Sequence, residues 1–248
     1  MIEKQIDDLR VLLLQVREEP RVRREEHESF SRYSGLDLKQ IEILNAFDTP
    51  DFLPTVIVGY DALFVGGGSE ATVLEIDRYP FVEPAINLLR FCIEKEIPVF
   101  ASCFGFQLGV IALGGEILRA DHDFEMGTLS IHLASAAITD PLFFDVPERF
   151  QAVAVHKESA LEPPPGCTLL AYTETCCHSF RVNDKPFWGF QFHPEVDRQR
   201  LVERLKIYQA EYTDGAEQLN KVLSTAVETP ESNALVRKFV DRILLTGM

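Results

Sequence analysis

The stretch Val99-Phe-Ala-Ser-Cys-Phe-Gly-Phe-Gln-Leu-Gly109 decides the fold. It opens as a short apolar run, typical of a buried strand, and changes at Cys103 to apolar residues at helical spacing. A cysteine at such a junction, followed two residues later by Gly105, is typical of a nucleophile elbow, because glycine lets the chain bend there without a Cβ clash. The positive end of the following helix favours a thiolate. The stretch therefore predicts a reactive thiol at the end of a strand.

A second stretch supplies partners for the Cys103 thiol. Without such partners, a cysteine between a strand and a helix is often a small buried hydrophobic residue. Phe187-Trp-Gly-Phe-Gln-Phe-His-Pro-Glu195 predicts a strand that ends in His193-Pro194-Glu195. Because side chains alternate along a strand, we expect His193 and Glu195 to leave it on the same side. A histidine so placed takes the thiol proton and returns it to a leaving amine, while the carboxylate orients the imidazole. The two stretches together predict a Cys103, His193 and Glu195 triad.

These motifs resemble the class I, triad-type glutamine amidotransferases, most closely the glutaminase domains of GMP synthases and the stand-alone γ-glutamyl peptidases. Two further stretches match in the family's order. Tyr60-Asp-Ala-Leu-Phe-Val-Gly-Gly-Gly-Ser69 resembles the family's strand and glycine-rich oxyanion loop, and Ala154-Val-His-Lys-Glu-Ser159 resembles its substrate-side loop. The resemblance extends roughly over residues 10 to 208.

The resemblance implies roles for further residues. The backbone N–H groups of Gly67 and Phe104 are expected to form an oxyanion hole. The substrate is expected to meet Gln107, Gly68, Glu158 and Ser159. His156 falls in the substrate-side loop; a second proton carrier there is the alternative, but one base is sufficient.

The amino-acid composition excludes several classes of function and predicts a cellular location. The 248 residues include 24 Lys and Arg and 39 Asp and Glu, which gives a net charge of −15. This negative charge argues against binding to nucleic acid or to an anionic membrane. No apolar run approaches membrane-spanning length, and no secretion signal opens the sequence. Five cysteines without framework spacing favour a reducing, cytoplasmic location. Zinc-site spacing, a phosphate-loop ending and a dinucleotide fingerprint are all missing, so no cofactor and no metal are expected.

The pattern of segments predicts an α/β fold: an open, mostly parallel, doubly wound (flavodoxin-like) sheet with a small antiparallel β portion and C-terminal helices. Apolar runs at 10–16, 39–45 and 62–65 are expected strands, and 81–95 is an expected helix. The charged stretch 17–33 is expected to be a solvated helix that ends at Gly35. A strand in a hairpin is expected at 124–133, and further strands are expected at 150–155, 168–172, 176–182 and 187–192.

The chain is expected to divide into an amidotransferase domain, residues 1–208, and a C-terminal helical extension, residues 209–248. A weak helix is expected at 216–226, and Thr229-Pro230-Glu231 is a typical helix start. The helix that follows carries an apolar stripe that includes Leu235, Phe239 and Ile243. Packing on its own domain, a homodimer or a partner subunit would each bury this stripe.

Three functions remain open. The first is a glutaminase that hydrolyses the γ-carboxamide of glutamine and passes ammonia to a separate synthetase subunit. The second is a self-contained hydrolase or peptidase for γ-glutamyl small molecules. The third is a non-catalytic binding protein on the same fold, because a fold does not guarantee an activity.

Overall fold

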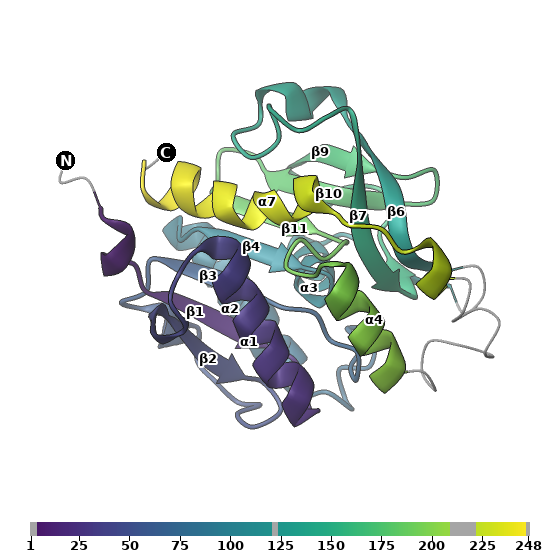
Figure 1. The fold of residues 1–248 in the computed structure, drawn as a ribbon. Coiled ribbons are helices and arrows are strands. Elements are labelled where there is room, and N and C mark those ends of the chain that lie inside the picture. Colours follow the sequence, from purple (N-terminus) through teal and green to yellow (C-terminus); the bar gives the residue numbers. More distant parts are fainter. Residues whose placement is uncertain (1–3, 121–123, 209–221, 247–248) are drawn as a thin grey trace.

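The computed structural model describes residues 4–120, 124–208 and 222–246, and a mixed sheet forms its centre (Figure 1). Within these ranges nine strands pair in the order β2-β1-β3-β4-β11-β10-β9-β6-β7. Their bounds are β1 (Val11–Gln15), β2 (Ile41–Asn45), β3 (Ala62–Val65), β4 (Val99–Ser102), β6 (Glu125–Leu133), β7 (Arg149–His156), β9 (Cys167–Tyr172), β10 (Cys177–Val182) and β11 (Phe187–Phe190).

One half of the sheet is parallel. Strands β2, β1, β3, β4 and β11 run in the same direction. The inner strands β3, β4 and β11 are buried at every position, as near-continuous apolar runs require when both faces of a sheet are covered. The parallel pairing brings the carboxyl ends of β4 and β11 to the same edge, although about ninety residues separate them in the sequence.

Helices cover both faces of this parallel half. Side chains of α1 (Pro20–Ser34) and α7 (Pro230–Phe239) belong to the core cluster on one face, and those of α2 (Val82–Lys95) and α3 (Phe104–Ala112) to the cluster on the other. A further α-helix, α4, runs from Arg198 to Ile207. As expected, α1 ends at Gly35, whose φ of 76° closes the helix. This doubly wound α/β arrangement confirms the predicted fold class. None of the described helices is long and apolar enough to cross a bilayer.

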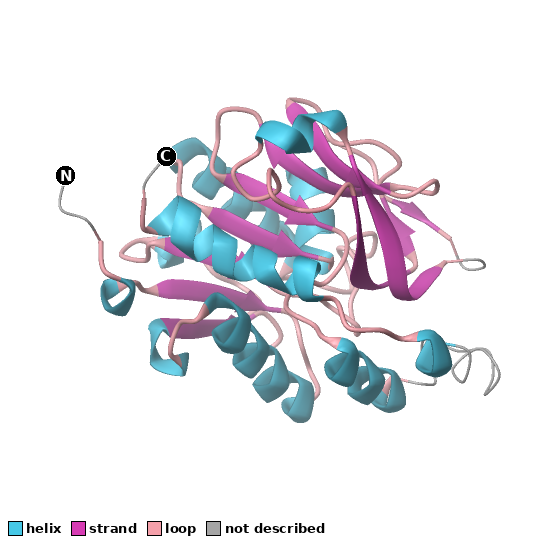
Figure 2. Ribbon diagram, turned by 45° about the horizontal axis from the view of Figure 1, so that its top comes forward, coloured by secondary structure: helices cyan, strands magenta, loops and turns pink. Residues whose placement is uncertain are grey.

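The other half of the sheet is antiparallel and continues from β11 without a break. Strands β10, β9, β6 and β7 each pair antiparallel with their neighbours. Figure 2 shows these strands gathered at one end of the molecule. The antiparallel portion is therefore an extension of the main sheet. A separate two-stranded sheet joins β5 (Leu118–Arg119) to β8 (Glu158–Ser159). Short 3₁₀ turns occupy Ile6–Asp8, Leu38–Gln40, Pro54–Ile57 and Ser135–Thr139, and a π turn follows α7 at Val240–Leu244.

The C-terminal apolar stripe lies in the core of the same molecule. Helix α7 crosses the sheet beside α1 (Figure 1), and Leu235, Phe239 and Ile243 are buried there. The ring of Phe239 lies 5.4 Å from that of Phe100 and 6.0 Å from those of Phe64 and Trp188. Of the weak helix expected at 216–226, positions 216–221 lie outside the described residues, and 222–225 are helical. The proposed division at residue 208 stays a prediction.

Replacement of Phe239 by Ala tests this packing. Phe239 is fully buried, and removing such a ring leaves a cavity, so we expect the free energy of unfolding to fall by about 3–5 kcal/mol. Urea denaturation of the full chain measures the change. The control is Leu53→Ala, because Leu53 is 71% exposed and its truncation should change stability by at most about 0.5 kcal/mol. Equal stability of the two variants would contradict the packing of α7 on the sheet.

Candidate active site

Cys103 occupies a strained turn between β4 and α3. Its φ of 49° and ψ of −97° are rare for a residue with a side chain, and such strain is characteristic of functional sites. The Cys103 N–H donates to the carbonyl of Phe190 at 2.7 Å, which fixes the turn to the end of β11. Gly105 is required for close approach, since a Cβ there would lie 2.7 Å from the Cβ of Val65. Cys103 thus adopts the strained backbone conformation, and the missing side chain at Gly105 lets the start of α3 approach Val65.

His193 and Glu195 are paired as expected, by a different local structure. His193 Nδ1 lies 2.7 Å from Glu195 Oε1, and both side chains are buried. Strand β11 ends at Phe190, however, so the prediction of a strand reaching His193 is wrong. Residues 193–195 form a turn closed by the Val196 N–H, which donates to the His193 carbonyl at 3.1 Å. Pro194 favours this turn because it removes a strand-forming N–H and fixes φ.

The electrostatics of the pair favour an imidazolium. Burial opposes a charged His193, but its interactions with Cys103 and Glu195 outweigh this effect and raise the pKa of His193 to about 9. Burial likewise opposes ionisation of Glu195, yet the charge of His193 lowers its pKa to about 2. The pKa of His193 in the folded state lies above its usual value of about 6.5. Protonation of His193 therefore increases the free energy of unfolding, and this contribution is fully present below about pH 6.5. This contribution is lost as the pH rises through about 9.

The glycine-rich loop after β3 lies against these side chains. A Cβ on Gly67 would fall 2.7 Å from His193 Cε1, and a Cβ on Gly68 would fall 3.0 Å from the ring of Phe104. The Gly105 N–H donates to the Gly66 carbonyl at 3.3 Å, which ties the loop to α3. Phe104 is the first residue of α3, where backbone N–H groups have no acceptor within the helix. The loop and the helix start therefore both border Cys103.

A groove of about 540 Å³ opens beside Cys103. Its lining carries both charge signs: it includes Gly68, Glu70, Arg78, Cys103, Gln107, Arg119, Val155, His156, Lys157 and Glu158. Two of the predicted substrate contacts, Gln107 and Glu158, are bonded to each other: Gln107 Nε2 donates to the Glu158 carbonyl at 2.9 Å. The Glu158 carboxylate also accepts a hydrogen bond from the hydroxyl of Thr72 at 2.5 Å. Burial raises the pKa of Glu158. Ser159 pairs with Leu118 in the small sheet and is not among the residues that line the groove.

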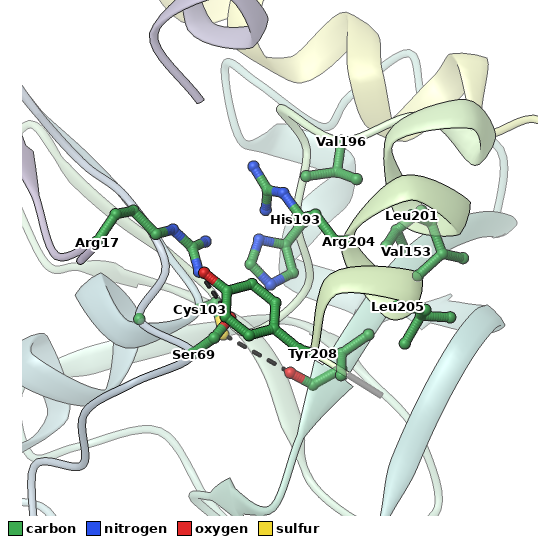
Figure 3. A pocket seen from close by; sticks show the side chains of 12 residues that line it. Arg17, Ser69, Cys103, Val153, His193, Val196, Leu201, Arg204, Leu205 and Tyr208 are labelled. Atoms are coloured by element: carbon green, nitrogen blue, oxygen red, sulfur yellow. Dashed lines mark hydrogen bonds between the residues drawn. The ribbon is translucent and has the colours of Figure 1, made fainter. Parts of the chain in front are cut away.

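A layer of buried ion pairs lies beside Cys103 and His193, and the sequence did not predict it. Arg17 and Glu26 are 1% and 0% exposed and pair at 2.9 Å, and Arg17 also donates to Ser69 Oγ at 2.8 Å. Glu25 pairs with Arg204 of α4 at 2.7 Å. Figure 3 shows Arg17, Arg204, His193 and Cys103 around one small cavity.

The expectation of a wholly solvated helix at 17–33 is therefore wrong. Positions 22, 25, 26, 29 and 30 are buried, and they follow the spacing of an inward-facing helical stripe. The stripe was present in the sequence, but Glu25 and Glu26 occupy its centre. Their partners lie outside this helix, Arg17 in the connection between β1 and α1 and Arg204 in α4.

Comparison with known proteins identifies the family. The model of the family described as "Glutamine amidotransferase class-I" matches residues 36–205, and the chain belongs to this family. It is 33% identical over 118 residues to a subunit of the glutamine-hydrolysing GMP synthase of Methanocaldococcus jannaschii, a match that covers 47% of this chain and 61% of that protein. The subunit of the same name from Methanococcus maripaludis is 36% identical over 130 residues, covering 52% and 66%. The chain thus matches less than two thirds of these relatives' length.

Solved structures share the fold. A glutamine amidotransferase from Thermotoga maritima superimposes with a TM-score of 0.75 at 22% identity, covering 95% of this chain and 98% of that one. A glutamine amidotransferase from Methylobacillus flagellatus gives 0.69 at 19% identity, with 98% of each chain covered. At these identities the likeness establishes the architecture alone.

The change Glu195→Gln tests the pairing with His193. It keeps the shape of the side chain but removes its charge, so the pKa of His193 should fall from about 9 toward its usual value of about 6.5. Histidine NMR signals followed through a pH titration measure the pKa. The matched control is Glu94→Gln, at an exposed carboxylate on α2. An unchanged His193 pKa in Glu195→Gln would contradict the pairing.

Arg17→Met tests the buried ion layer. It leaves the Glu26 carboxylate buried without its partner, so we expect a loss of about 3–5 kcal/mol in the free energy of unfolding. The double variant Arg17→Met with Glu26→Met removes both charges and should lose less than Arg17→Met alone. Urea denaturation compares these variants and Glu26→Met with the parent protein. A double variant whose loss equals the sum of the two single losses would show that the charges are not coupled.

Proposed function

We propose that the protein hydrolyses the γ-carboxamide of glutamine through Cys103, His193 and Glu195 and delivers ammonia to a separate acceptor enzyme. The observation that carries the proposal is the strained Cys103 beside the buried His193–Glu195 pair, at the rim of a polar groove. Membership of the class I glutamine amidotransferases supports the same reaction.

The first half of the reaction forms a thioester. The Cys103 thiolate attacks the carboxamide carbon, and the carbonyl oxygen becomes an oxyanion, which we place at the N–H groups of Gly67 and Phe104. As the tetrahedral intermediate collapses, the imidazolium of His193 protonates the leaving nitrogen, and ammonia departs. Glu195 is charged throughout and holds the imidazole through Nδ1, which leaves Nε2 for proton transfer.

The second half releases glutamate. His193, now neutral, takes a proton from water, and the hydroxide attacks the thioester carbon. The second tetrahedral intermediate expels the thiolate, which again faces the imidazolium that His193 became on taking the proton from water, and the new γ-carboxyl group of glutamate loses its proton to solvent. Water is the one additional reactant, and the enzyme returns to its initial state.

The groove supplies the groups that an amino acid substrate requires. The α-amino and α-carboxylate groups of glutamine carry opposite charges, and the lining offers Glu158 and Glu70 beside Arg78, Arg119 and Lys157. We propose Glu158 as the contact for the amino group and Gln107 as the residue that fixes it, because the Gln107 amide donates to the Glu158 carbonyl. Gly68 also lines the groove, a position compatible with the predicted contact between Gly68 and the substrate. Ser159 would have to act through the backbone of β8.

The relatives provide the reason to propose a separate acceptor. Each is named as one subunit of a glutamine-hydrolysing GMP synthase, and we propose that this chain likewise works with a synthetase subunit. The size and openness of the groove favour a second candidate, a hydrolase for γ-glutamyl amides or short peptides, because a site of this volume accommodates more than one amino acid.

Product analysis separates the candidates. Purified protein is incubated with glutamine and with a panel of γ-glutamyl amides and dipeptides, and glutamate and ammonia are quantified. We expect glutamine turnover that Cys103→Ala abolishes, because no other group forms the thioester. Preference for the dipeptides would favour the second candidate.

A covalent probe covers the case of no turnover. A glutamine-mimicking electrophile should label Cys103 in the intact chain, which mass spectrometry of the peptides detects. Labelling without turnover indicates a site that requires its partner subunit. If neither turnover nor labelling occurs, the proposal fails and a binding protein on the same fold is the better description.

A further inference from the structure

Four side chains that the proposed reaction does not use converge behind one wall of the groove. They are Glu125 at the start of β6, His156 at the end of β7, Cys176 just before β10, and His178 within β10. One donor atom from each lies within 4.8 Å of every other. His156, Cys176 and His178 are buried, and His156 is 6% exposed.

The Glu125 carboxylate is the centre of this cluster, which we call the Glu125 cluster. Its Oε2 lies 2.7 Å from His178 Nε2, 3.0 Å from His156 Nε2 and 3.5 Å from Cys176 Sγ. Its other oxygen, Oε1, accepts hydrogen bonds from the hydroxyls of Thr173 at 2.7 Å and Thr175 at 2.6 Å. The threonines therefore hold the carboxylate so that Oε2 faces the two imidazoles and the thiol.

We propose that the Glu125 cluster binds Zn²⁺ through Glu125, His156, Cys176 and His178. Zinc in proteins takes four tetrahedral ligands from this donor set, with bonds of about 2.0–2.3 Å. Such bonds separate the ligand atoms by about 3.2–3.8 Å, so the present arrangement needs shifts of about an ångström or less. The two threonines act as the outer hydrogen-bond partners that orient a ligating carboxylate.

Hydrogen bonding without a metal accounts for the Glu125 cluster less well. It satisfies His178 Nε2, but the N–H direction of His156 Nε2 is not aligned with Glu125 despite the 3.0 Å separation. That nitrogen has no hydrogen-bond partner among the described residues. Unpaired buried polar groups are costly, and a bond to zinc removes this one. Binding replaces the Cys176 S–H proton, which passes to solvent, and uses the lone pairs of two neutral imidazoles.

The location indicates what the metal would do. Four protein ligands leave no open position, which is typical of a structural site. The metal would join β6, β7 and β10 at one point. His156 also lines the groove, and the carbonyl of His178 accepts from the N–H of Gln191 at 2.9 Å, two residues before His193. Zinc at the Glu125 cluster would therefore stiffen both the groove wall and the segment that carries His193.

Cobalt titration provides the test. The full chain carrying Cys103→Ala, which removes the other thiolate near an imidazole, is freed of metal and titrated with Co²⁺ and then Zn²⁺. We expect one Co²⁺ per chain, a tetrahedral visible spectrum, and a thiolate-to-cobalt band in the near ultraviolet that Zn²⁺ abolishes. Cys176→Ser should remove the thiolate band and weaken binding at least about 10-fold, whereas the neighbouring Cys177→Ser should not, because Cys177 lies outside the Glu125 cluster.

A second measurement does not depend on the folding of variants with changes at Cys176 or His178. Saturating Zn²⁺ should protect Cys176 from alkylation in the Cys103→Ala protein, and fragment mass spectra distinguish it from Cys177. Absence of a cobalt spectrum, or alkylation of Cys176 unchanged by Zn²⁺, would overturn the proposal. Metal binding that persists unchanged in Cys176→Ser and in His178→Gln would also overturn it.

Discussion

The parallel pairing of β4 with β11 is the constraint on which the site depends. It places the ends of two segments that lie far apart in sequence at one edge of the sheet. The Cys103 N–H is bonded to the Phe190 carbonyl, and the turn that carries His193 and Glu195 begins directly beyond. Two adjacent strands thus bring Cys103 and the turn of His193 together, and the glycine loop after the next strand, β3, lies against both. The site is assembled by strand order, so each segment can remain short.

Much of this arrangement is predictable from sequence because it is encoded locally. Apolar runs identify the parallel strands, and the strand-to-helix change at Cys103 identifies the elbow. The close approach of His193 to Glu195 was also predicted, although the reason given was wrong: alternation along a strand was assumed, and a turn at Pro194 produces it. Spacing of two residues brings side chains together in several backbone conformations, so the pairing is more predictable than its geometry.

The features that sequence reasoning missed share one physical property: charged or polar side chains are buried against partners that come from another segment of the chain. Glu26 looks like a surface residue until Arg17 lies beside it, and Glu25 until Arg204 does. The Glu125 cluster is similar, because its residues come from three separate segments and have no recognisable spacing. Composition and periodicity describe one helix or strand at a time, whereas each of these contacts joins side chains from different segments.

The position of β11 inside the sheet has a consequence for synthesis of the protein. It lies between β4 and β10, so until residues 187–190 have emerged from the ribosome, β4 can pair only with β3, and the Cys103 N–H lacks its acceptor, the Phe190 carbonyl. Contacts between such distant segments form late, because closing long loops costs entropy before any contact compensates. Cys103 therefore meets the β11 segment and His193 only after about ninety further residues have been made.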